Sequence, residues 1–315
     1  MIEVSHLTKY YGAKAALQDV SFDVKKGEIL GFLGPNAAGK TTAMRILTCY
    51  MPATSGTAKI SGYDVLEHSL DVRKRIGYLP ENPPLYSEMT VNGFLEFVAK
   101  VKGIERRQVK RKVADSMEKT AIGHVSGRLI KQLSKGYKQR VGIAQALIHN
   151  PEVLILDEPT IGLDPKQIIE VRELIKSLGG DHTVILSTHI LPEVSMTCGR
   201  VIIINEGKVV ASDTPENLNR RLKGSENIFV EVAGPKAEVE SKIRKLQGVT
   251  RISRKDGKKN GETGFTVETE LKTDIRKELA ACIVQNGWGL LEMRPVGMSL
   301  EEIFLHLTTN EEEVS

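Results

Sequence analysis

Apolar residues in the first two thirds of the chain gather in short continuous runs that predict buried strands. Runs that are apolar at almost every position are typical of strands covered on both faces, as in parallel sheets. Helical patterns, such as the one at 167–178, separate these runs and therefore favour a largely parallel central sheet. The runs lie at 27–33, 153–156, 183–187 and 200–204.

Other strands are expected near the start of the chain, where apolar positions are spaced rather than continuous. Residues 2–9 and 15–24 fit this description, and 55–62 is a further strand bracketed by turns. The second segment has apolar residues mainly at every other position, which predicts a strand with one buried face.

The pattern becomes helical between residues 90 and 147. Thr90 is a plausible N-cap for a helix over 91–102, and two further helices are expected over 106–119 and 136–149. Two adjacent prolines, at 83 and 84, forbid a helix before this region, so a helical insertion is expected over about 84–150. The basic start of 106–119 fits either a solvated helix face or a nucleic-acid patch. The absence of interleaved aromatic residues favours the solvated face.

The composition shifts near residues 219–224, which we interpret as a linker. Beyond it, the pattern predicts elements in the order β-α-β-β-α-β, with a lysine-rich hairpin at 255–262. This order is typical of a small α+β ferredoxin-like domain. The predicted organisation is a first domain over 1–222, an accessory domain over 225–297, and a C-terminal helix and tail over 298–315.

Composition restricts the class of protein. Of the 315 residues, 40% are hydrophobic and 27% charged, as in an ordinary globular chain. No apolar run approaches the roughly 18 residues that a membrane-spanning helix needs, and the start has no signal-peptide architecture. The three cysteines are widely separated, which favours a reducing compartment. A net charge of +4 is too small to indicate nucleic-acid binding by itself. We therefore expect a cytoplasmic chain.

Residues 34–42 carry the most specific motif in the sequence. They follow a predicted strand, precede a predicted helix and read G-x-x-x-x-G-K-T, the phosphate-binding loop of nucleoside-triphosphatases. In such a loop the backbone N–H groups converge on an anion, Lys40 reaches the β- and γ-phosphates, and the Thr41 hydroxyl binds Mg²⁺. The flanking strand and helix argue against a glycine-rich turn that matches by chance. The expected nucleotide-binding residues are Gly34, Pro35, Asn36, Ala37, Ala38, Gly39, Lys40, Thr41 and Thr42.

Two acids, Asp157 and Glu158, follow the buried strand at 153–156. Asp157 is placed to hold Mg²⁺, and Glu158 to activate an attacking water as general base, an effect worth roughly 10²–10⁴-fold. The alternative is a solvated start of a loop. Because we expect this strand to lie beside the phosphate-loop strand in a parallel sheet, both acids would reach the carboxyl edge, where ligands bind.

The chain resembles the ATPase subunit of an ABC transporter over residues 1 to about 215. The family signature, usually Leu-Ser-Gly-Gly-Gln, is present as a variant at 133–140, LSKGYKQR, and the D-loop as GLDP at 162–165. The resemblance implies a P-loop NTPase fold with an antiparallel β subdomain. It also implies that Tyr11 stacks on adenine and that His189 senses the γ-phosphate. Without the resemblance, Tyr11 reads equally well as a turn residue and His189 as an ordinary histidine. Residues that would meet the ATP of a second copy are Ser134, Lys135, Gly136 and Asp164.

Three positions depart from the family pattern. Ala37 replaces a glycine, Lys135 replaces the first signature glycine, and Glu81 replaces the usual Q-loop glutamine. If position 37 needs a positive φ, alanine costs on the order of 1–2 kcal/mol. Glu81 can contact both ATP and Mg²⁺, since a carboxylate binds the metal as an amide does. With the C-terminal domain and the segment SLEEIF at 299–304, these variants resemble the drug-export and gliding-motility-associated exporter subfamily.

The resemblance implies an ATP-hydrolysing subunit that uses ATP and Mg²⁺ to drive a separately encoded membrane permease. Two copies would pair head-to-tail around two ATP molecules, peripheral at the inner face of the cell membrane and without nucleic acid. The alternative is a non-transport ABC ATPase, such as a translation factor or a DNA-repair clamp. A single cassette and the absence of a long heptad run disfavour both, and the two residues Glu158 and His189 disfavour a regulatory module without turnover. The cargo would be selected by the permease.

Overall fold

The computed structural model describes residues 1–221, 226–256, 262–269 and 275–296. The chain divides into two compact units, Met1–Pro215 and Glu216–Ser315. The predicted closing helix at 299–307 lies outside the described residues, as does most of the hairpin at 255–262. Among the described residues, no helix has the length and apolar character needed to cross a membrane.

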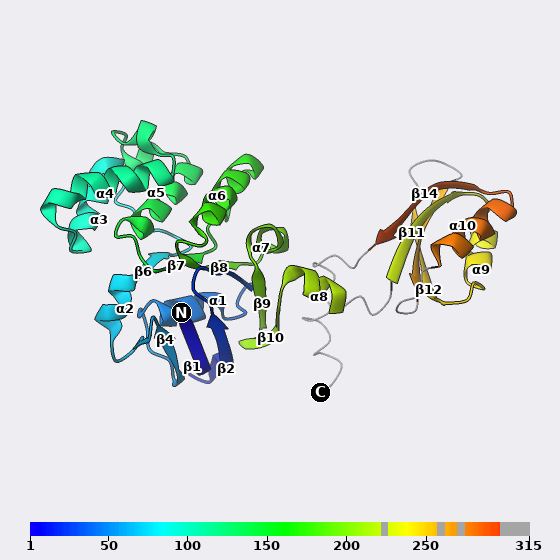
Figure 1. Cartoon of the computed structure of the whole chain (residues 1–315), viewed down its shortest axis with the longest axis horizontal. Coiled ribbons are helices and arrows are strands. Elements are labelled where there is room, and N and C mark those ends of the chain that lie inside the picture. Colours follow the sequence, from blue (N-terminus) through cyan, green and yellow to red (C-terminus); the bar gives the residue numbers. More distant parts are fainter. Residues whose placement is uncertain (222–225, 257–261, 270–274, 297–315) are drawn as a thin grey trace. The chain divides into compact units, whose positions relative to one another are not determined.

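The first unit is built on a six-stranded sheet in the order β10-β9-β3-β8-β7-β6 (Figure 1). Neighbouring strands run parallel except at the edge, where β10 is antiparallel to β9. This confirms the mostly parallel central sheet. The strands are β3 (Ile29–Leu33), β6 (Ile76–Leu79), β7 (Val153–Asp157), β8 (Thr183–Thr188), β9 (Arg200–Asn205) and β10 (Lys208–Asp213).

The expectation that the acid-ended strand lies beside the phosphate-loop strand is wrong. β8 lies between β3 and β7, with Leu33 paired to Thr188 and Ser187 paired to Asp157. Apolar runs identify buried strands but not their order, because the crossover connections decide which strands become neighbours. The acids nevertheless reach the expected carboxyl edge, since all three strands are parallel and end in register.

An antiparallel sheet in the order β2-β1-β4-β5 forms a second layer of this unit. Its apolar face shares one core with helix α1 and the central sheet, and the fully buried Ile2, Leu17, Met44 and Phe32 belong to that core. Helix α1, which directly follows the phosphate loop, is therefore packed against residues of both sheets. The elements are β1 (Ile2–Tyr11), β2 (Lys14–Val24), β4 (Ser55–Ile60), β5 (Tyr63–Asp64), α1 (Lys40–Leu47) and α2 (Ser69–Arg75).

The helical part of the first unit has its own core, centred on Phe94, Leu95 and Val141. Thr90 caps α3 as predicted, because its side chain accepts a hydrogen bond from Gly93 N. Helix α5 approaches β6 so closely that a Cβ on Gly77 would lie 2.2 Å from the Ala146 carbonyl oxygen. The helices are α3 (Val91–Val101), α4 (Arg106–Lys119) and α5 (Lys135–Leu147), with 3₁₀ turns at Gly123–Val125 and Ile130–Gln132.

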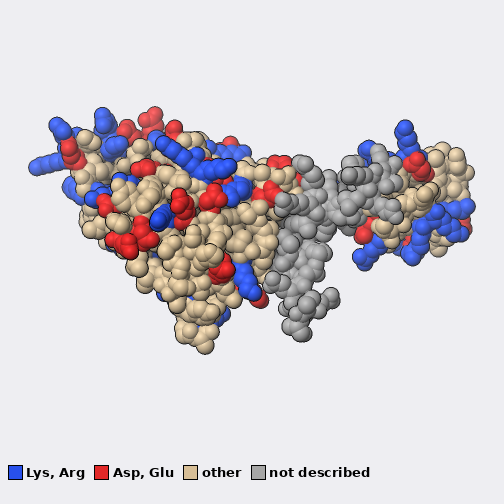
Figure 2. Space-filling model, turned by 60° about the horizontal axis from the view of Figure 1, so that its bottom comes forward, with Lys and Arg blue, Asp and Glu red and all other residues tan. Residues whose placement is uncertain are grey.

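Basic side chains at the start of α4 are exposed, and one of them, Arg107, pairs with Glu105 at 2.6 Å. Figure 2 shows Lys and Arg intermixed with Asp and Glu over this face of the first unit rather than in one basic stripe. This arrangement fits the solvated helix face that the sequence favoured.

The remaining helices of the chain's first 221 residues are α6 (Pro165–Leu178), α7 (Leu191–Thr197) and α8 (Pro215–Arg221). The second unit, which begins within α8 at Glu216, continues as β11 (Glu226–Ala233), α9 (Lys236–Ile243), β12 (Val249–Asp256), β13 (Glu262–Thr269), α10 (Arg276–Gln285) and β14 (Gly289–Val296). Its antiparallel sheet has the order β12-β13-β11-β14, over a core that includes Val230, Phe265 and Leu279. This is the split β-α-β-β-α-β arrangement expected for a ferredoxin-like domain.

Candidate nucleotide-hydrolysis site

The phosphate loop connects β3 to α1 with backbone angles that most residues avoid. Gly39 has φ +106° and serves as the N-cap residue of α1. Ala37 has φ +66°, in the left-handed region where a side chain costs on the order of 1–2 kcal/mol. Position 37 therefore does have a positive φ, so alanine in place of the usual glycine leaves the loop strained at this residue.

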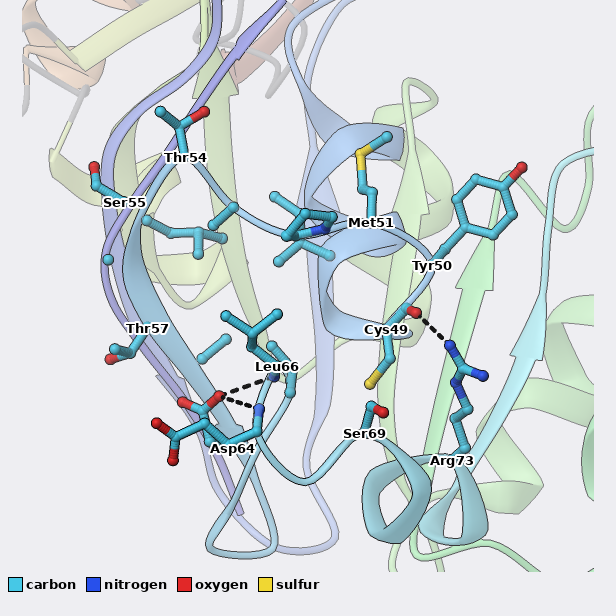
Figure 3. A pocket seen from close by; sticks show the side chains of 18 residues that line it. Cys49, Tyr50, Met51, Thr54, Ser55, Thr57, Asp64, Leu66, Ser69 and Arg73 are labelled. Atoms are coloured by element: carbon cyan, nitrogen blue, oxygen red, sulfur yellow. Dashed lines mark hydrogen bonds between the residues drawn. The ribbon is translucent and has the colours of Figure 1, made fainter.

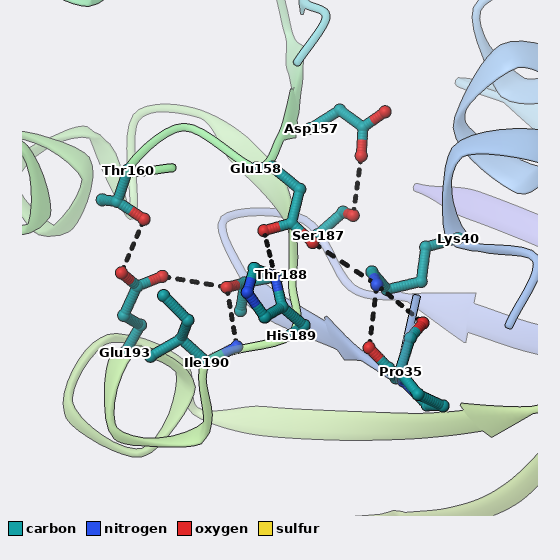
Figure 4. Close-up of polar contacts among 11 residues, drawn as sticks. Pro35, Lys40, Asp157, Glu158, Thr160, Ser187, Thr188, His189, Ile190 and Glu193 are labelled. Carbon is teal, nitrogen blue, oxygen red and sulfur yellow. Dashed lines mark hydrogen bonds and ion pairs between the residues drawn. The ribbon is translucent and has the colours of Figure 1, made fainter. Parts of the chain in front are cut away.

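The ammonium of Lys40 is buried and lies over the loop that precedes it (Figure 4). Its Nζ donates to the carbonyl oxygens of Gly34 at 2.8 Å and Pro35 at 3.1 Å. Nζ also lies 3.4 Å from Oε1 of Glu158, an ion pair in which both side chains are 6% exposed. The ammonium of Lys40 is thus placed directly opposite Glu158, the acid that follows β7.

Asp157 ends β7 in a fully buried position. Ser187 Oγ donates to its Oδ1 at 2.8 Å, whereas Oδ2 has no hydrogen-bond partner among the described residues. Burial raises the pKa of Asp157, and the nearby charges of Glu158 and Glu81 raise it further, against the hydrogen bond from Ser187, which lowers it. A buried carboxylate with one free oxygen and acidic neighbours is a good ligand for a cation.

Glu158 and His189 face each other across the ends of β7 and β8. His189 Nδ1 lies 2.9 Å from Glu158 Oε2, and the Glu158 backbone has φ +50°. The two oxygens of Glu158 are thus shared between Lys40 and His189 (Figure 4). This brings together the predicted general base and the predicted γ-phosphate sensor.

Two cavities meet at the phosphate loop. One of about 510 Å³ is lined by the loop, by Tyr11 and by Glu158, and the other, of about 470 Å³, reaches Asp157. Thr41 and Glu81 line both cavities. Tyr11 ends β1 and is half exposed, with its hydroxyl donating to Met51 Sδ at 3.1 Å. The structure therefore brings Tyr11, Glu81 and the two acids to one site around the loop.

A third cavity, of about 350 Å³, lies beyond the C-terminal end of α1 (Figure 3). Two of the charged side chains that line it form hydrogen bonds with nearby backbone groups. Asp64 Oδ1 accepts from the backbone N–H groups of Leu66 and Glu67, and Arg73 donates to the Cys49 carbonyl. Its main charged groups are satisfied locally, so they leave little for a ligand to bind. The chemistry of the chain is therefore concentrated at the phosphate loop.

Comparison with known proteins agrees with this geometry. The family model for ABC transporters matches residues 17–161. The linearmycin resistance ATP-binding protein LnrL of Bacillus subtilis is 32% identical over 317 residues, which cover 98% of this chain and 98% of that protein. The chain belongs to the ABC transporter ATP-binding family.

Other comparisons extend this result. The bacitracin transport ATP-binding protein BcrA of Bacillus licheniformis is 40% identical over 223 residues, 70% of this chain and 72% of that protein. The structure of a dimeric bacterial ABC transporter cassette has a TM-score of 0.63 and 26% identity, covering 68% of this chain and 98% of that chain. The same cassette is also known in a post-hydrolysis state with ADP and phosphate, with a TM-score of 0.63 and 25% identity. The ABC ATPase fold, ATP hydrolysis and the transport interpretation are confirmed, and the non-transport alternative is not supported.

The signature residues of this ABC ATPase lie apart from its own phosphate loop. Ser134 is the N-cap of α5 and accepts a hydrogen bond from Tyr137 N at 3.4 Å, and Asp164 caps α6 through Gln167 N at 2.9 Å. Within the described part of the chain, none of the residues at 134–136 or Asp164 lines either cavity at the loop. Lys135 instead extends toward the D-loop, where a Cβ on Gly162 would lie 2.2 Å from its Nζ.

Sequence reasoning missed several polar residues around Glu158 and His189, the two candidate catalytic residues of this ABC subunit. Ser187 supports Asp157, and the buried Glu193 of α7 connects Thr160 to Thr188. The sequence signal that could have revealed Glu193 was an acid in the first turn of a helix that begins shortly after a strand and its following histidine, His189. Such an acid is usually explained by the helix dipole, so its burial could be learned only from the structure.

Proposed function

We propose that this ABC subunit drives export through a separately encoded membrane permease by closing, head-to-tail, on two ATP molecules shared with a second copy. The observation that carries this proposal is the division of the site. Lys40 and His189 both contact Glu158, which directly follows Asp157, whereas Ser134 and Asp164 cap helices elsewhere on the same chain and line neither cavity at the loop. A second copy in head-to-tail orientation would supply the missing signature.

The phosphate chain of ATP would lie along residues 34–42, with adenine against Tyr11. Binding would draw Lys40 Nζ away from the Gly34 and Pro35 carbonyl oxygens toward the β- and γ-phosphates. The carbonyl contacts therefore hold the ammonium near its working position before ATP arrives, which reduces the reorganisation that binding requires.

Residues at the end of β7 fit a magnesium ion. The free Oδ2 of Asp157, the Thr41 hydroxyl and the Glu81 carboxylate offer the hard oxygen ligands that Mg²⁺ prefers. When bound, the ion neutralises charge that develops on the β- and γ-phosphate oxygens.

Hydrolysis would use Glu158 as the base that accepts a proton from the attacking water. His189 orients this carboxylate through Nδ1 and leaves Nε2 available to the γ-phosphate. Loss of the γ-phosphate would remove the contact shared with Ser134 and Gly136 of the second copy. The dimer would then open, as in other γ-phosphate switches.

The names of the relatives support an export role at a membrane. LnrL is a linearmycin resistance protein and BcrA a bacitracin transport protein. We propose a peripheral position at the inner face of the cell membrane, with the surface around Glu81 and the helical insertion passing closure to the permease. We further propose residues 1–222 as the nucleotide-binding domain and 225–297 as the accessory domain.

The test is size-exclusion chromatography of Glu158→Gln with and without Mg-ATP. The change removes the general base and leaves the phosphate loop intact, so we expect an ATP-dependent shift from monomer to dimer. Adding Ser134→Arg in the same chain should abolish the shift, because the bulky side chain would block the signature from a second phosphate loop. A monomer under every condition would contradict closure by this chain alone.

A further inference from the structure

Glu193 is an unusually placed acid in the first turn of α7. Its side chain is buried, with the residue 4% exposed. Oε1 accepts a hydrogen bond from Thr160 Oγ1 at 2.6 Å, and Oε2 accepts one from Thr188 Oγ1 at 2.9 Å (Figure 4). Among the described residues, no lysine, arginine or histidine forms an ion pair with it.

The two threonines belong to the segments that carry the catalytic pair. Thr160 is two residues after Glu158, and Thr188 directly precedes His189. A second contact joins these two segments, because His189 Nδ1 lies 2.9 Å from Glu158 Oε2. Glu193 therefore connects, through its hydrogen bonds with Thr160 and Thr188, the same two segments that the Glu158–His189 contact connects directly.

Both threonine hydroxyls donate to Glu193, so each of its two carboxylate oxygens acts as an acceptor. Thr188 Oγ1 already accepts from Ile190 N at 3.0 Å, so its proton is directed to Glu193. Thr160 also uses its hydroxyl proton for this carboxylate. A carboxylate accepts from both threonines at once, whereas an amide of the same size would accept from one and have to donate to the other, which reverses one of the two hydrogen bonds.

A buried carboxylate without a cation is expensive for the folded state. Packing alone would be served better by an apolar residue of similar volume, since a strand end and a short helix need no charge to meet. The presence of a buried carboxylate is explained if holding the two catalytic segments in position for hydrolysis matters more than the folding stability that the buried charge costs.

We propose that Glu193 is a positioning residue for ATP hydrolysis, which holds the Glu158 and His189 segments in register through Thr160 and Thr188. This inference rests on the roles proposed above for Glu158 and His189. It requires no contact between Glu193 and ATP. The expected effect is on the rate of hydrolysis rather than on nucleotide binding or closure.

The experiment uses the full chain with Glu193→Gln, which preserves volume. We expect kcat to fall roughly 10–100-fold, because small misplacements of a general base have effects of that size. KM for ATP should stay unchanged, since Glu193 touches none of the residues at 34–42. Glu173→Gln on α6 is the matched control, because Glu173 is exposed, lies outside the site and, within the described ranges, forms an ion pair with Lys176 alone. This control should keep full activity.

A second measurement separates positioning from general support of the fold. If hydrolysis is slowed while closure is intact, the ATP-bound dimer of Glu193→Gln should persist longer, in proportion to the loss of kcat. Thr188→Val, which deletes one donor to the carboxylate, should act in the same direction. A shorter-lived dimer, a raised KM or an unchanged kcat would overturn the inference.

The outcome for Glu158→Gln distinguishes this inference from the proposed function. If Glu158→Gln retains normal turnover, the proposed catalytic site itself is wrong. If Glu158→Gln abolishes turnover while Glu193→Gln behaves like the Glu173→Gln control, only the positioning role is overturned.

Discussion

Negative charge is concentrated around the end of β7. Asp157, Glu158 and Glu81 lie near one another at the cavity edge, and Lys40 is the cation that pairs with Glu158. Burial and these acidic neighbours raise the pKa of Asp157, which means that its charged form is destabilised without a cation. The oxygens gathered here would suit a divalent cation such as the proposed Mg²⁺, which would offset this negative charge.

Ala37 gives the most direct test of backbone strain. Ala37→Gly should raise the free energy of unfolding by up to about 1 kcal/mol, because glycine adopts φ +66° without a steric cost, although it also gains freedom in the unfolded chain. Urea denaturation without nucleotide measures the difference. Ala38→Gly is the control, since Ala38 lacks a positive φ and is buried. It should lose stability, and a loss for Ala37→Gly as well would contradict the strain argument.

Glu81 tests the unusual acid beside the metal site. Glu81→Gln should retain ATP hydrolysis, because an amide oxygen can also bind a divalent cation. Removing one negative charge near the triphosphate should change the relative rates with Mg²⁺ and Mn²⁺. Steady-state hydrolysis with each ion measures the preference, and identical profiles for both proteins would argue against a contact between residue 81 and the metal.

At the scale of elements, the proposed interface residues are also helix caps. Ser134 begins α5 and Asp164 begins α6, and each side chain accepts a hydrogen bond from a backbone N–H in the first turn. Such caps typically contribute about 1 kcal/mol. The same side chains hold their helices in place and, in the proposed dimer, would contact the second copy, so an alanine variant would combine two effects.

Asp164 allows these effects to be separated. Asp164→Ala should lower the free energy of unfolding by about 1 kcal/mol through loss of the cap, whereas Asp164→Ser should retain most of it. Both changes remove the carboxylate, so both should weaken the ATP-dependent dimer in the Glu158→Gln background. Urea denaturation and size-exclusion chromatography provide the two readouts. A serine variant that closes normally would exclude a role for the carboxylate at the interface.

At the scale of the whole molecule, the two compact units have separate cores. The first unit contains the candidate catalytic residues and both cavities at the loop, and the second has its own four-stranded sheet. The dimeric cassette that matches over 98% of its own length covers 68% of this chain, so it has no counterpart of the remainder. A cassette can therefore fold without such a second unit.

A chain shortened to residues 1–221 tests this independence. It retains α8 and should unfold in one cooperative transition, because the cores that surround the phosphate loop remain complete. Its affinity for ATP, measured by isothermal titration calorimetry, should match that of the full chain. Loss of cooperative unfolding would show that the second unit is needed for the stability of the first.

The sequence by itself determined the elements whose signals are local. The phosphate loop, the acid pair after β7, the cap at Thr90 and the β-α-β-β-α-β order could all be predicted, because spacing and residue type fix them over a few residues. The candidate site residues of the first unit come from the same local signals and from the family resemblance, which supplied Tyr11, His189 and the signature, and their roles stay predictions.

Only the tertiary structure decided which segments become neighbours. β8 lies between β3 and β7, and Glu193 accepts hydrogen bonds from Thr160 and Thr188. Both features depend on crossover connections that bring together segments far apart in the chain. The left-handed conformation at Glu158 also became visible only there. Local patterns record propensity and burial, whereas strand order and the partners of a buried charge result from how the whole unit packs.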